Sequence, residues 1–262
     1  MKIREITDVI ERFAPLALQE SYDNSGLIVG RADDEVHRAL LAVDVTEEVM
    51  DEAEQEGCDI IITHHPIIFH ALKRFNSASV TERCVERAIR NGIALYACHT
   101  NLDSTPHGMS WRLAGMIGLG ELKVLQPSNA EGAGFGVVGE LAEKVPTVEF
   151  LRHVAEITGA EVVRHSDIAT PAVSRVAVCT GAGASLIGDA ARAGAELYIT
   201  ADLKYNDFTP YGTGGLTVAD IGHFESEYCA IKILFDVLSK NLITFAVRES
   251  IHSRNPVNYL TK

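Results

Sequence analysis

The sequence predicts an α/β protein made of two duplicated lobes, and a repeated pattern carries this prediction. Residues 40–65 and 176–202 both read as a strand, a helix and a second strand. Gly57 matches Gly194 and Thr63 matches Thr200, so a single offset of 137 residues superposes the two segments. Repetition of a whole supersecondary unit in this way indicates internal duplication.

The elements of each segment follow from its residues. In the first, the aliphatic run LLAVDV predicts a strand, TEEVMDEAEQEG predicts a helix capped by Thr46, and CDIIITHHP predicts the second strand. In the second, the corresponding pieces are VAVCTG, ASLIGDAARAG and AELYITAD. This order is typical of parallel strands joined by a crossover helix.

A further pair of matching segments follows at an offset of 124 residues, because 99 plus 124 is 223 and 103 plus 124 is 227. ALYACHTNLD places Asp103 four residues after His99, and TVADIGHFESE places Glu227 four residues after His223. In both segments an apolar run leads into the polar pair. The two matches occur in the same order along the chain, which supports duplication.

The lobe boundary is predicted near Pro127, where QPSNAEGAGFGVVGEL gathers residues typical of connections. The first lobe is then 1–126 and the second 127–262. Within the second lobe, VPTVEFLRHVAEITGAEVVRH predicts a helix capped by Thr147 and then a short strand. The last helix is predicted to begin on Glu227 and to lead into a strand, and this end of the chain is a candidate to pack back on the first lobe.

Composition narrows the class of protein. No apolar stretch of the 262 residues approaches the roughly 18 residues that a membrane span needs. Residues 1–13 predict an amphipathic helix instead of an export signal. The five cysteines form no C-x-x-C pair, which indicates a reduced, cytoplasmic chain. A formal charge of −13 argues against nucleic-acid binding, which depends on clustered Lys and Arg.

Metal ligands are predicted at the carboxyl ends of the parallel strands, where α/β sheets form their functional crevice. Adjacent imidazoles at His64 and His65 follow DIIIT, and strand alternation would direct them apart, which suits two ions better than one. Asp103, His223 and Glu227 complete the set.

Three imidazoles with two carboxylates favour Zn, Mn, Fe or Co over Mg or Ca. Because five ligands are few for two ions, we expect Glu227 to bridge them, with water in the open positions. Such a pair of ions is typical of hydrolytic chemistry. Taken alone, His-His-Pro is equally compatible with a turn whose imidazoles are solvated.

Other polar residues near the predicted crevice have alternative interpretations. His99 is expected to orient a ligand such as Asp103 instead of binding metal itself. Asp202 and Lys204 either line a substrate pocket opposite the metals, which we favour, or form a surface pair. In the loop from Thr180 to Ser185, Gly181 and Gly183 offer N–H groups to a phosphate or simply make a tight strand-to-helix turn.

The chain resembles the NIF-three-like dinuclear metal-binding family, also called GTP cyclohydrolase I type-two homologs. The resemblance covers nearly the whole chain and is carried by YDNSGLIVG, DVTEEVMDEA, ITHHPIIF, HTNLDS, CTGAGAS, ITADLKYND and GHFESE. It implies that His64, His65, Asp103, His223 and Glu227 are the metal ligands. It also implies two intertwined lobes and a toroidal homohexamer.

Three positions depart from the family pattern: Ala201 replaces a Gly, Asn206 replaces a His, and Tyr22 replaces a Trp. None is a predicted ligand. Because Asn206 replaces a His of the family pattern, any step on the substrate that this His would serve is in doubt. The chain also has too few residues between Leu125 and Val176 for the large domain that some members insert there.

The function predicted from these observations is a dinuclear metal-dependent hydrolase that acts on a nucleotide or related small molecule through activated water. The resemblance implies cyclohydrolase activity. Opening a guanine ring needs a general acid, and the sequence assigns no residue to this role or to any other catalytic role. Two alternatives lack turnover: a metal-handling or chaperone protein, and a ring-shaped scaffold that binds partner proteins.

Overall fold

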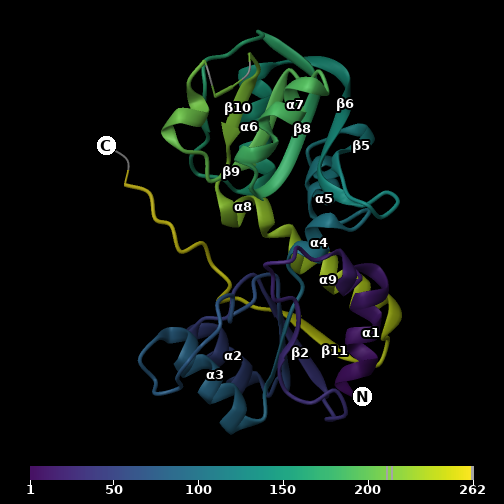
Figure 1. Ribbon diagram of the computed structural model, residues 1–262, viewed down its shortest axis with the longest axis vertical. Helices are drawn as coiled ribbons and strands as arrows, with labels where there is room; N and C mark the ends of the chain where they lie inside the picture. Colours follow the sequence, from purple (N-terminus) through teal and green to yellow (C-terminus); the bar gives the residue numbers. More distant parts are fainter. Residues whose placement is uncertain (211, 214, 261–262) are drawn as a thin grey trace. The chain divides into compact units, whose positions relative to one another are not determined.

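The structure is a computed structural model that describes residues 1–210, 212–213 and 215–260. The chain forms two compact units, each assembled from two segments of the sequence. The first unit contains Met1–Thr105 and Ala230–Arg254, and the second contains Pro106–Cys229 and the tail from Asn255 onward. Each unit has a mixed sheet with helices packed on it, which confirms the predicted mixed α/β class (Figure 1).

The sheet of the first unit has the strand order β1-β4-β3-β2-β11. Strands β2, β3, β4 and β11 are parallel, while β1 is antiparallel to β4 at one edge. The strands are β1 (Gly26–Val29), β2 (Arg38–Ala42), β3 (Ile60–Thr63), β4 (Ala94–Ala97) and β11 (Ala246–Glu249). The helices are α1 (Ile3–Phe13), α2 (Glu47–Glu56), α3 (Val80–Asn91), α4 (Thr100–Ser104) and α9 (Cys229–Asn241), with a short 3-10 turn, η1, at Leu16–Leu18.

The core of the first unit forms where α2 and α3 pack on one face of this sheet. Val49 and Met50 of α2 and Val85 of α3 are buried against Leu40 and Ile61 of the central strands. Thr46 caps α2 as predicted, since its side chain accepts a hydrogen bond of 3.2 Å from the amide of Val49. Helices α1 and α9 cover the other face (Figure 1).

The second unit has a larger sheet, of order β5-β6-β8-β9-β10-β7. Strands β8, β9 and β10 are parallel, and β5, β6 and β7 pair antiparallel. The strands are β5 (Gly120–Pro127), β6 (Gly134–Pro146), β7 (Arg164–His165), β8 (Ala172–Ala182), β9 (Leu197–Ala201) and β10 (Thr217–Asp220). The helices are α5 (Met109–Met116), α6 (Thr147–Thr158), α7 (Ile187–Arg192) and α8 (His223–Glu227), with 3-10 turns η2 (Ala184–Leu186) and η3 (Tyr205–Phe208).

Apolar side chains bury both faces of this second sheet. Phe150 and Val154 of α6 pack on Val176 and Ile199 on one face. On the other face, Ile187 of α7 joins a cluster with neighbouring strand residues. A sheet covered on both sides explains why its central strands read as continuous apolar runs in the sequence.

The repeated pattern of the sequence reappears in the topology. The parallel trio β2, β3 and β4 of the first unit corresponds to the trio β8, β9 and β10 of the second. Each trio is flanked by an antiparallel edge strand, β1 beside β4 and β7 beside β10. The polar pair of each repeat lies on the short helix that follows its third strand, α4 or α8.

Three predicted details differ from the structure. Pro127 is not a boundary between units: it ends β5, pairs with Gly134 and so belongs to a hairpin within one sheet. The cap of α6 is Pro146, because Thr147 is already helical and directs its hydroxyl to the carbonyl of Thr170. The last helix is two helices, α8 and α9, and α8 begins at His223 instead of Glu227.

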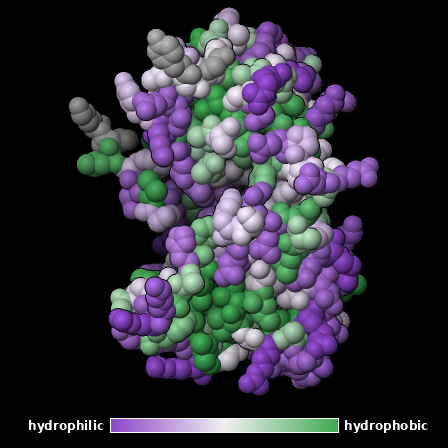
Figure 2. Space-filling model, in the orientation of Figure 1, coloured by the Kyte–Doolittle hydropathy of each residue, from purple (hydrophilic) through white to green (hydrophobic). Residues whose placement is uncertain are grey.

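The burial of the cysteines and the character of the surface both agree with the composition. All five cysteines are buried, as expected of residues that pack like small apolar side chains. Hydrophilic side chains cover the edges of the face drawn in Figure 2, with apolar patches between them. Within the described part of the chain, no helix has the length and apolar character to cross a membrane.

A partly exposed carboxylate before β9, that of Glu196, predicts how the second unit responds to acid. The carboxylate of Glu196 accepts hydrogen bonds from the amides of Ser174, at 2.6 Å, and Arg175, at 3.1 Å, and pairs with the ammonium of Lys144 at 3.0 Å. The bond from the amide of Ser174 contributes most to lowering the pKa of Glu196 from 4.5 to about 2. A carboxyl with a lowered pKa stabilises the fold above its unfolded pKa.

We therefore expect Glu196→Gln to lower the free energy of unfolding at pH 7 by about 1–2 kcal/mol, a value reduced for solvent screening. The difference from the parent chain should shrink as pH falls from 4.5 toward 2, because the parent's carboxyl then becomes protonated too. Urea unfolding at several pH values measures it, with the exposed Glu143→Gln as control. A difference that stays constant across this pH range would contradict the assignment.

Candidate metal centre

The first unit brings its candidate ligands together at the carboxyl ends of neighbouring parallel strands. Strand β3 ends at Thr63 and leads directly into His64 and His65. Strand β4 pairs with it in register, Thr63 opposite Ala97, and leads into His99 and then α4, which carries Asp103. Because the two strands end at the same edge of the sheet, residues 35 positions apart in the sequence become neighbours, as from His64 to His99.

The imidazoles of this unit form a close group. The ring centroids of His64 lie 5.0 Å from His65 and 5.2 Å from His99, and those of His65 and His99 are 5.4 Å apart. One nitrogen from each of the three rings lies within 4.8 Å of the others, so the group could hold a metal ion. Asp103 faces the group, with its Oδ1 at 3.8 Å from Nε2 of His64.

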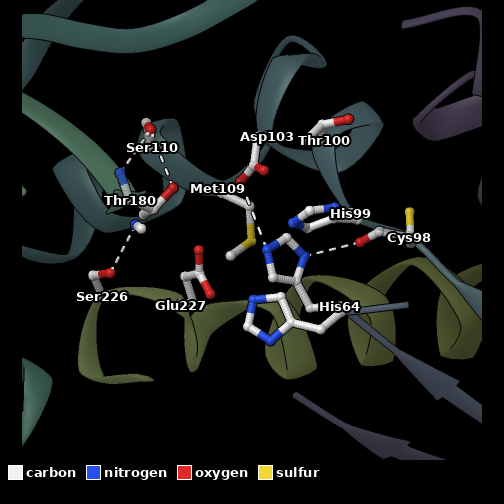
Figure 3. A network of polar contacts seen from close by, with 12 residues as sticks. His64, Cys98, His99, Thr100, Asp103, Met109, Ser110, Thr180, Ser226 and Glu227 are labelled. Atoms are coloured by element: carbon white, nitrogen blue, oxygen red, sulfur yellow. Dashed lines mark hydrogen bonds and ion pairs between the residues drawn. The ribbon is translucent and has the colours of Figure 1, made fainter. Parts of the chain in front are cut away.

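The second nitrogen of each ring is held by a backbone or carboxylate oxygen. Nδ1 of His64 donates to the carbonyl of Cys98 at 2.9 Å (Figure 3). Nδ1 of His65 lies 2.8 Å from the carboxylate of Asp44, and Nδ1 of His99 lies 2.7 Å from that of Asp23. An imidazole held at Nδ1 by an oxygen presents Nε2 as a lone-pair donor, which is the usual environment of a metal-binding histidine.

Asp23 is itself fixed by several donors. Its carboxylate accepts hydrogen bonds from the hydroxyl of Ser25 at 2.9 Å, the amide of Thr100 at 3.0 Å and the hydroxyl of Thr100. Burial would raise the pKa of Asp23, but the hydrogen bonds from His99 and Thr100 outweigh it and hold this pKa well below its usual range. A permanently charged carboxylate therefore orients His99, and the expected partner of that ring, Asp103, does not hold its Nδ1.

The second unit repeats the arrangement after β10. Gly222, with a φ of 91°, turns the chain into α8, where His223 and Glu227 lie one turn apart. Nε2 of His223 is 3.0 Å from Oε2 of Glu227, and its Nδ1 is 2.8 Å from Oδ2 of Asp202 at the end of β9. Two ligands of one tetrahedral zinc are separated by about 3.3 Å, given bonds of about 2.0–2.2 Å, so this pair fits a shared ion.

The charges around His223 show how strongly this position favours a cation. Burial of the ring would lower its pKa, but the carboxylates of Glu227 and Asp202 outweigh it and raise the pKa of His223 to about 9. A site that stabilises one positive charge on an imidazole between two carboxylates also suits a divalent ion, with the imidazole then neutral. The donor set of both units thus fits Zn, Mn, Fe or Co.

The Gly-rich segment that ends β8 forms a structural turn and also approaches Glu227. The amide of Gly181 donates to the hydroxyl of Ser226 at 2.9 Å, and the amide of Gly183 to that of Thr200 at 3.0 Å (Figure 3 shows Ser226 and Thr180). These two N–H groups are therefore used within the unit, which favours the turn over a phosphate site. A Cβ at Gly181 would overlap Oε1 of Glu227, so the glycine leaves room for that carboxylate.

The remaining candidate residues divide between site and surface. Asp202, predicted in a substrate pocket, contacts His223 directly. Lys204 is exposed, and its backbone amide donates to Asp207 at 2.7 Å where η3 begins. Ala201 is buried in β9, and Asn206 is exposed in η3.

Two orienting carboxylates, Asp44 and Asp23, were missing from the residues predicted from sequence. Asp44 lies two residues after the end of β2, in the segment LLAVDV, and so lies at the same strand edge as His65. The sequence feature that could have identified Asp44 is a carboxylate just after the first strand of the repeat. Asp23 lies in an irregular loop before β1, where periodicity gives no signal.

Fold and side chains together define a mixed α/β protein with imidazole and carboxylate groups that could hold metal ions. The family model of Duf34/NIF3 (NGG1p interacting factor 3) matches residues 1–256. The chain therefore belongs to the Duf34/NIF3 family, as the resemblance implied.

Relatives of known sequence agree with this assignment. A "GTP cyclohydrolase 1 type 2 homolog" of Clostridium perfringens is 34% identical over 229 residues, which cover 87% of each chain. "NIF3-like protein 1" of Drosophila melanogaster is 28% identical and covers 92% of this chain and 83% of its own.

Solved structures extend the likeness to the fold. A Bacillus cereus protein related to NIF3 superposes with a TM-score of 0.90 at 23% identity, covering 99% of both chains. Reduced HcgD from Methanocaldococcus jannaschii gives a TM-score of 0.79 at 30% identity, covering 95% of this chain and 97% of its own.

Proposed function

We propose that this protein is a metal-dependent hydrolase that holds two divalent ions per chain with His64, His65, Asp103, His223 and Glu227. The observation that carries the proposal is the pairing of a proposed ligand imidazole with a carboxylate in each unit: His65 with Asp44, and His223 with Asp202. Such pairs fix the tautomer and direction of metal-binding histidines. That all five ligands serve one pair of ions comes from the sequence pattern and the family resemblance.

The chemistry follows from the kinds of residue involved. Bound divalent ions would supply Lewis acidity and lower the pKa of a water molecule to near 7. Glu227, beside Gly181, is the proposed bridge between the ions, and Asp44 and Asp202 hold the imidazoles in position.

The proposed substrate is a nucleotide or a related small molecule. Support comes from the relatives whose name includes GTP cyclohydrolase and from Lys204, an exposed cation that follows Asp202 by two residues. Lys204 would attract an anionic group such as a phosphate. Because it is exposed, its contribution to binding should be modest, about two- to five-fold, and should weaken as salt is added.

We keep from the sequence analysis the expectation of six copies assembled in a ring. Large apolar side chains that are exposed in the single chain support self-association: Ile243 is 91% exposed, Tyr205 85% and Ile89 62%. The cytoplasm is the proposed location.

The function is tested by stripping the protein with a chelator, reloading it with Zn, Mn, Fe or Co, and assaying GTP, other nucleotides and phosphoesters for hydrolysis. We expect turnover that is lost on chelation, restored by one of these metals and absent in Glu227→Gln. Lys204→Ala should retain its metal and raise the KM for an anionic substrate by the factor given above. Full metal loading without turnover on any of these substrates, with rapid transfer of the ions to an acceptor protein, would support a metal-handling role instead.

A further inference from the structure

A separate pocket of about 490 Å³ lies in the second unit. It is lined by α8 and the residue after it, by the chain that follows α6, and by the tail beyond Asn255. The side chains that characterise it are Phe224, Glu225, Tyr228, Glu161, Asn255 and Tyr259. Of the described residues that line the pocket, none is a Lys, Arg or His, and none is a proposed metal ligand.

Glu225 places a buried carboxylate in this pocket. Its side chain lies on α8 between the proposed ligands His223 and Glu227 in sequence, and the residue is only 9% exposed. Oε1 accepts a hydrogen bond of 2.8 Å from the side-chain amide of Asn255. Oε2 is buried and has no hydrogen-bond partner among the described residues. A buried carboxylate oxygen without a donor is costly, so each such atom in a native fold needs an explanation.

Aromatic rings and a second carboxylate complete the lining. The rings of Phe224 and Tyr228 pack with centroids 5.6 Å apart at an interplanar angle of 47°. Tyr259 lies in the tail, and burial together with the negative charges of Glu225, Asp220 and Glu161 raises its pKa. The charged side chains of the described lining are thus carboxylates, Glu161 and Glu225.

A neighbouring cation, Arg164, already has partners of its own. The guanidinium of Arg164 pairs with Asp220, donates to the carbonyl of Leu203 at 3.0 Å and lies 5.3 Å from the ring centroid of Phe208. Arg164 does not line the pocket. No cation of the described pocket lining therefore neutralises the carboxylate of Glu225, which is left for a molecule that enters from outside.

We propose that this pocket binds a small organic cation that carries N–H donors, either a primary ammonium or a guanidinium group. The cation would pair with the carboxylate of Glu225, and its body would lie against the faces of Tyr228 and Phe224. Hydrogen bonds between ionised partners and contacts of cations with aromatic rings are both favourable in partly desolvated sites. A phosphate or other anion would instead meet two carboxylates without a compensating cation. The proposal does not depend on the metals or on the proposed hydrolase activity.

The test is a calorimetric titration of the full chain with agmatine, which carries both groups, at fixed salt. Glu225→Gln keeps the size of the side chain and its contact with Asn255 but removes the charge, so affinity should fall about tenfold or more. Tyr228→Leu should weaken binding about two- to five-fold through loss of the ring. Glu143→Gln, an exposed change in the same unit, should leave the affinity unchanged.

Separate titrations with putrescine and with methylguanidine then tell an ammonium site from a guanidinium site, and either result supports the proposal. Equal affinity of the parent chain and Glu225→Gln, no saturable binding of any of the three cations, or stronger binding of GMP than of agmatine would overturn it. If Glu225→Gln does not fold, Tyr228→Leu decides: unchanged affinity for agmatine in that variant would also overturn it. Metal content measured in parallel should be the same in all variants.

Discussion

Replacing Glu227 by Gln is expected to lower the metal content from the proposed two ions per chain to well below one, because the carboxylate proposed to bridge the ions would serve both of them. The amide that replaces it is neutral and a poor ligand for these metals. His65→Ala should remove mainly one ion, since a terminal imidazole serves one. Elemental analysis after reloading with Zn, Mn or Fe and gel filtration gives the ratio directly.

The control for this experiment is Glu143→Gln, which removes an exposed carboxylate of the second unit and should retain both ions. Circular dichroism of each variant checks that metal loss is not unfolding. Equal losses in Glu227→Gln and His65→Ala would reject the bridge, and a parent chain that binds no metal after reloading would reject the site as a whole.

Gly183→Ala is expected to destabilise the second unit by about 2–4 kcal/mol, among the largest effects of a single added methyl group in this chain. A Cβ at this position would overlap the hydroxyl of Thr200 and lie 2.5 Å from that of Tyr198. These hydroxyls bond the same residue: Thr200 accepts from the amide of Gly183 at 3.0 Å, and Tyr198 donates to its carbonyl at 2.8 Å. The methyl group would therefore disrupt two buried hydrogen bonds.

Gly188→Ala is the matched control, and its effect should have the opposite sign. Gly188 is an exposed residue within α7, and a Cβ there would meet only the mobile end of the Arg192 side chain, at 3.3 Å. Alanine at a helical position stabilises by about 0.5–1 kcal/mol relative to glycine. Urea unfolding of both variants measures the difference, and a Gly183→Ala chain as stable as the parent would show that the loop shifts without cost.

The sequence predicts secondary structure best where the spacing of apolar residues indicates which side chains are buried. The βαβ repeats were identified because their strands are buried on both faces and their helices start at a capping residue such as Thr46 or end near a glycine such as Gly194. The positions of His64 and His99 followed from the same pattern, since parallel strands end at a common edge. The mixed α/β class was correct for this reason.

The sequence does not predict the contacts that loop residues make with residues far away along the chain. Asp23 reaches His99 over 76 positions from a loop with no periodic pattern. The cluster of turn residues after Pro127 predicts a boundary between units, but in the structure it closes the hairpin between β5 and β6. Hairpin turns and connections between units favour the same residues, so the sequence alone does not distinguish them. The sequence from Glu227 onward is likewise typical of one continuous helix, so it does not indicate the break between α8 and α9 at Tyr228.

The pairing of β11 with β2 has a consequence for synthesis of the chain on the ribosome. Residues 246–249 pair in register with residues 38–41, and Glu52 anchors the residues beyond them through Ser250 and the amide of Ile251, at 3.1 Å. The edge of β2 therefore has no strand beside it until almost the whole polypeptide has been made. During that interval it exposes unpaired backbone groups that can recruit a foreign strand. The sheet whose first strand is made earliest is thus the sheet completed last, and chains terminated before β11 carry an open sheet edge.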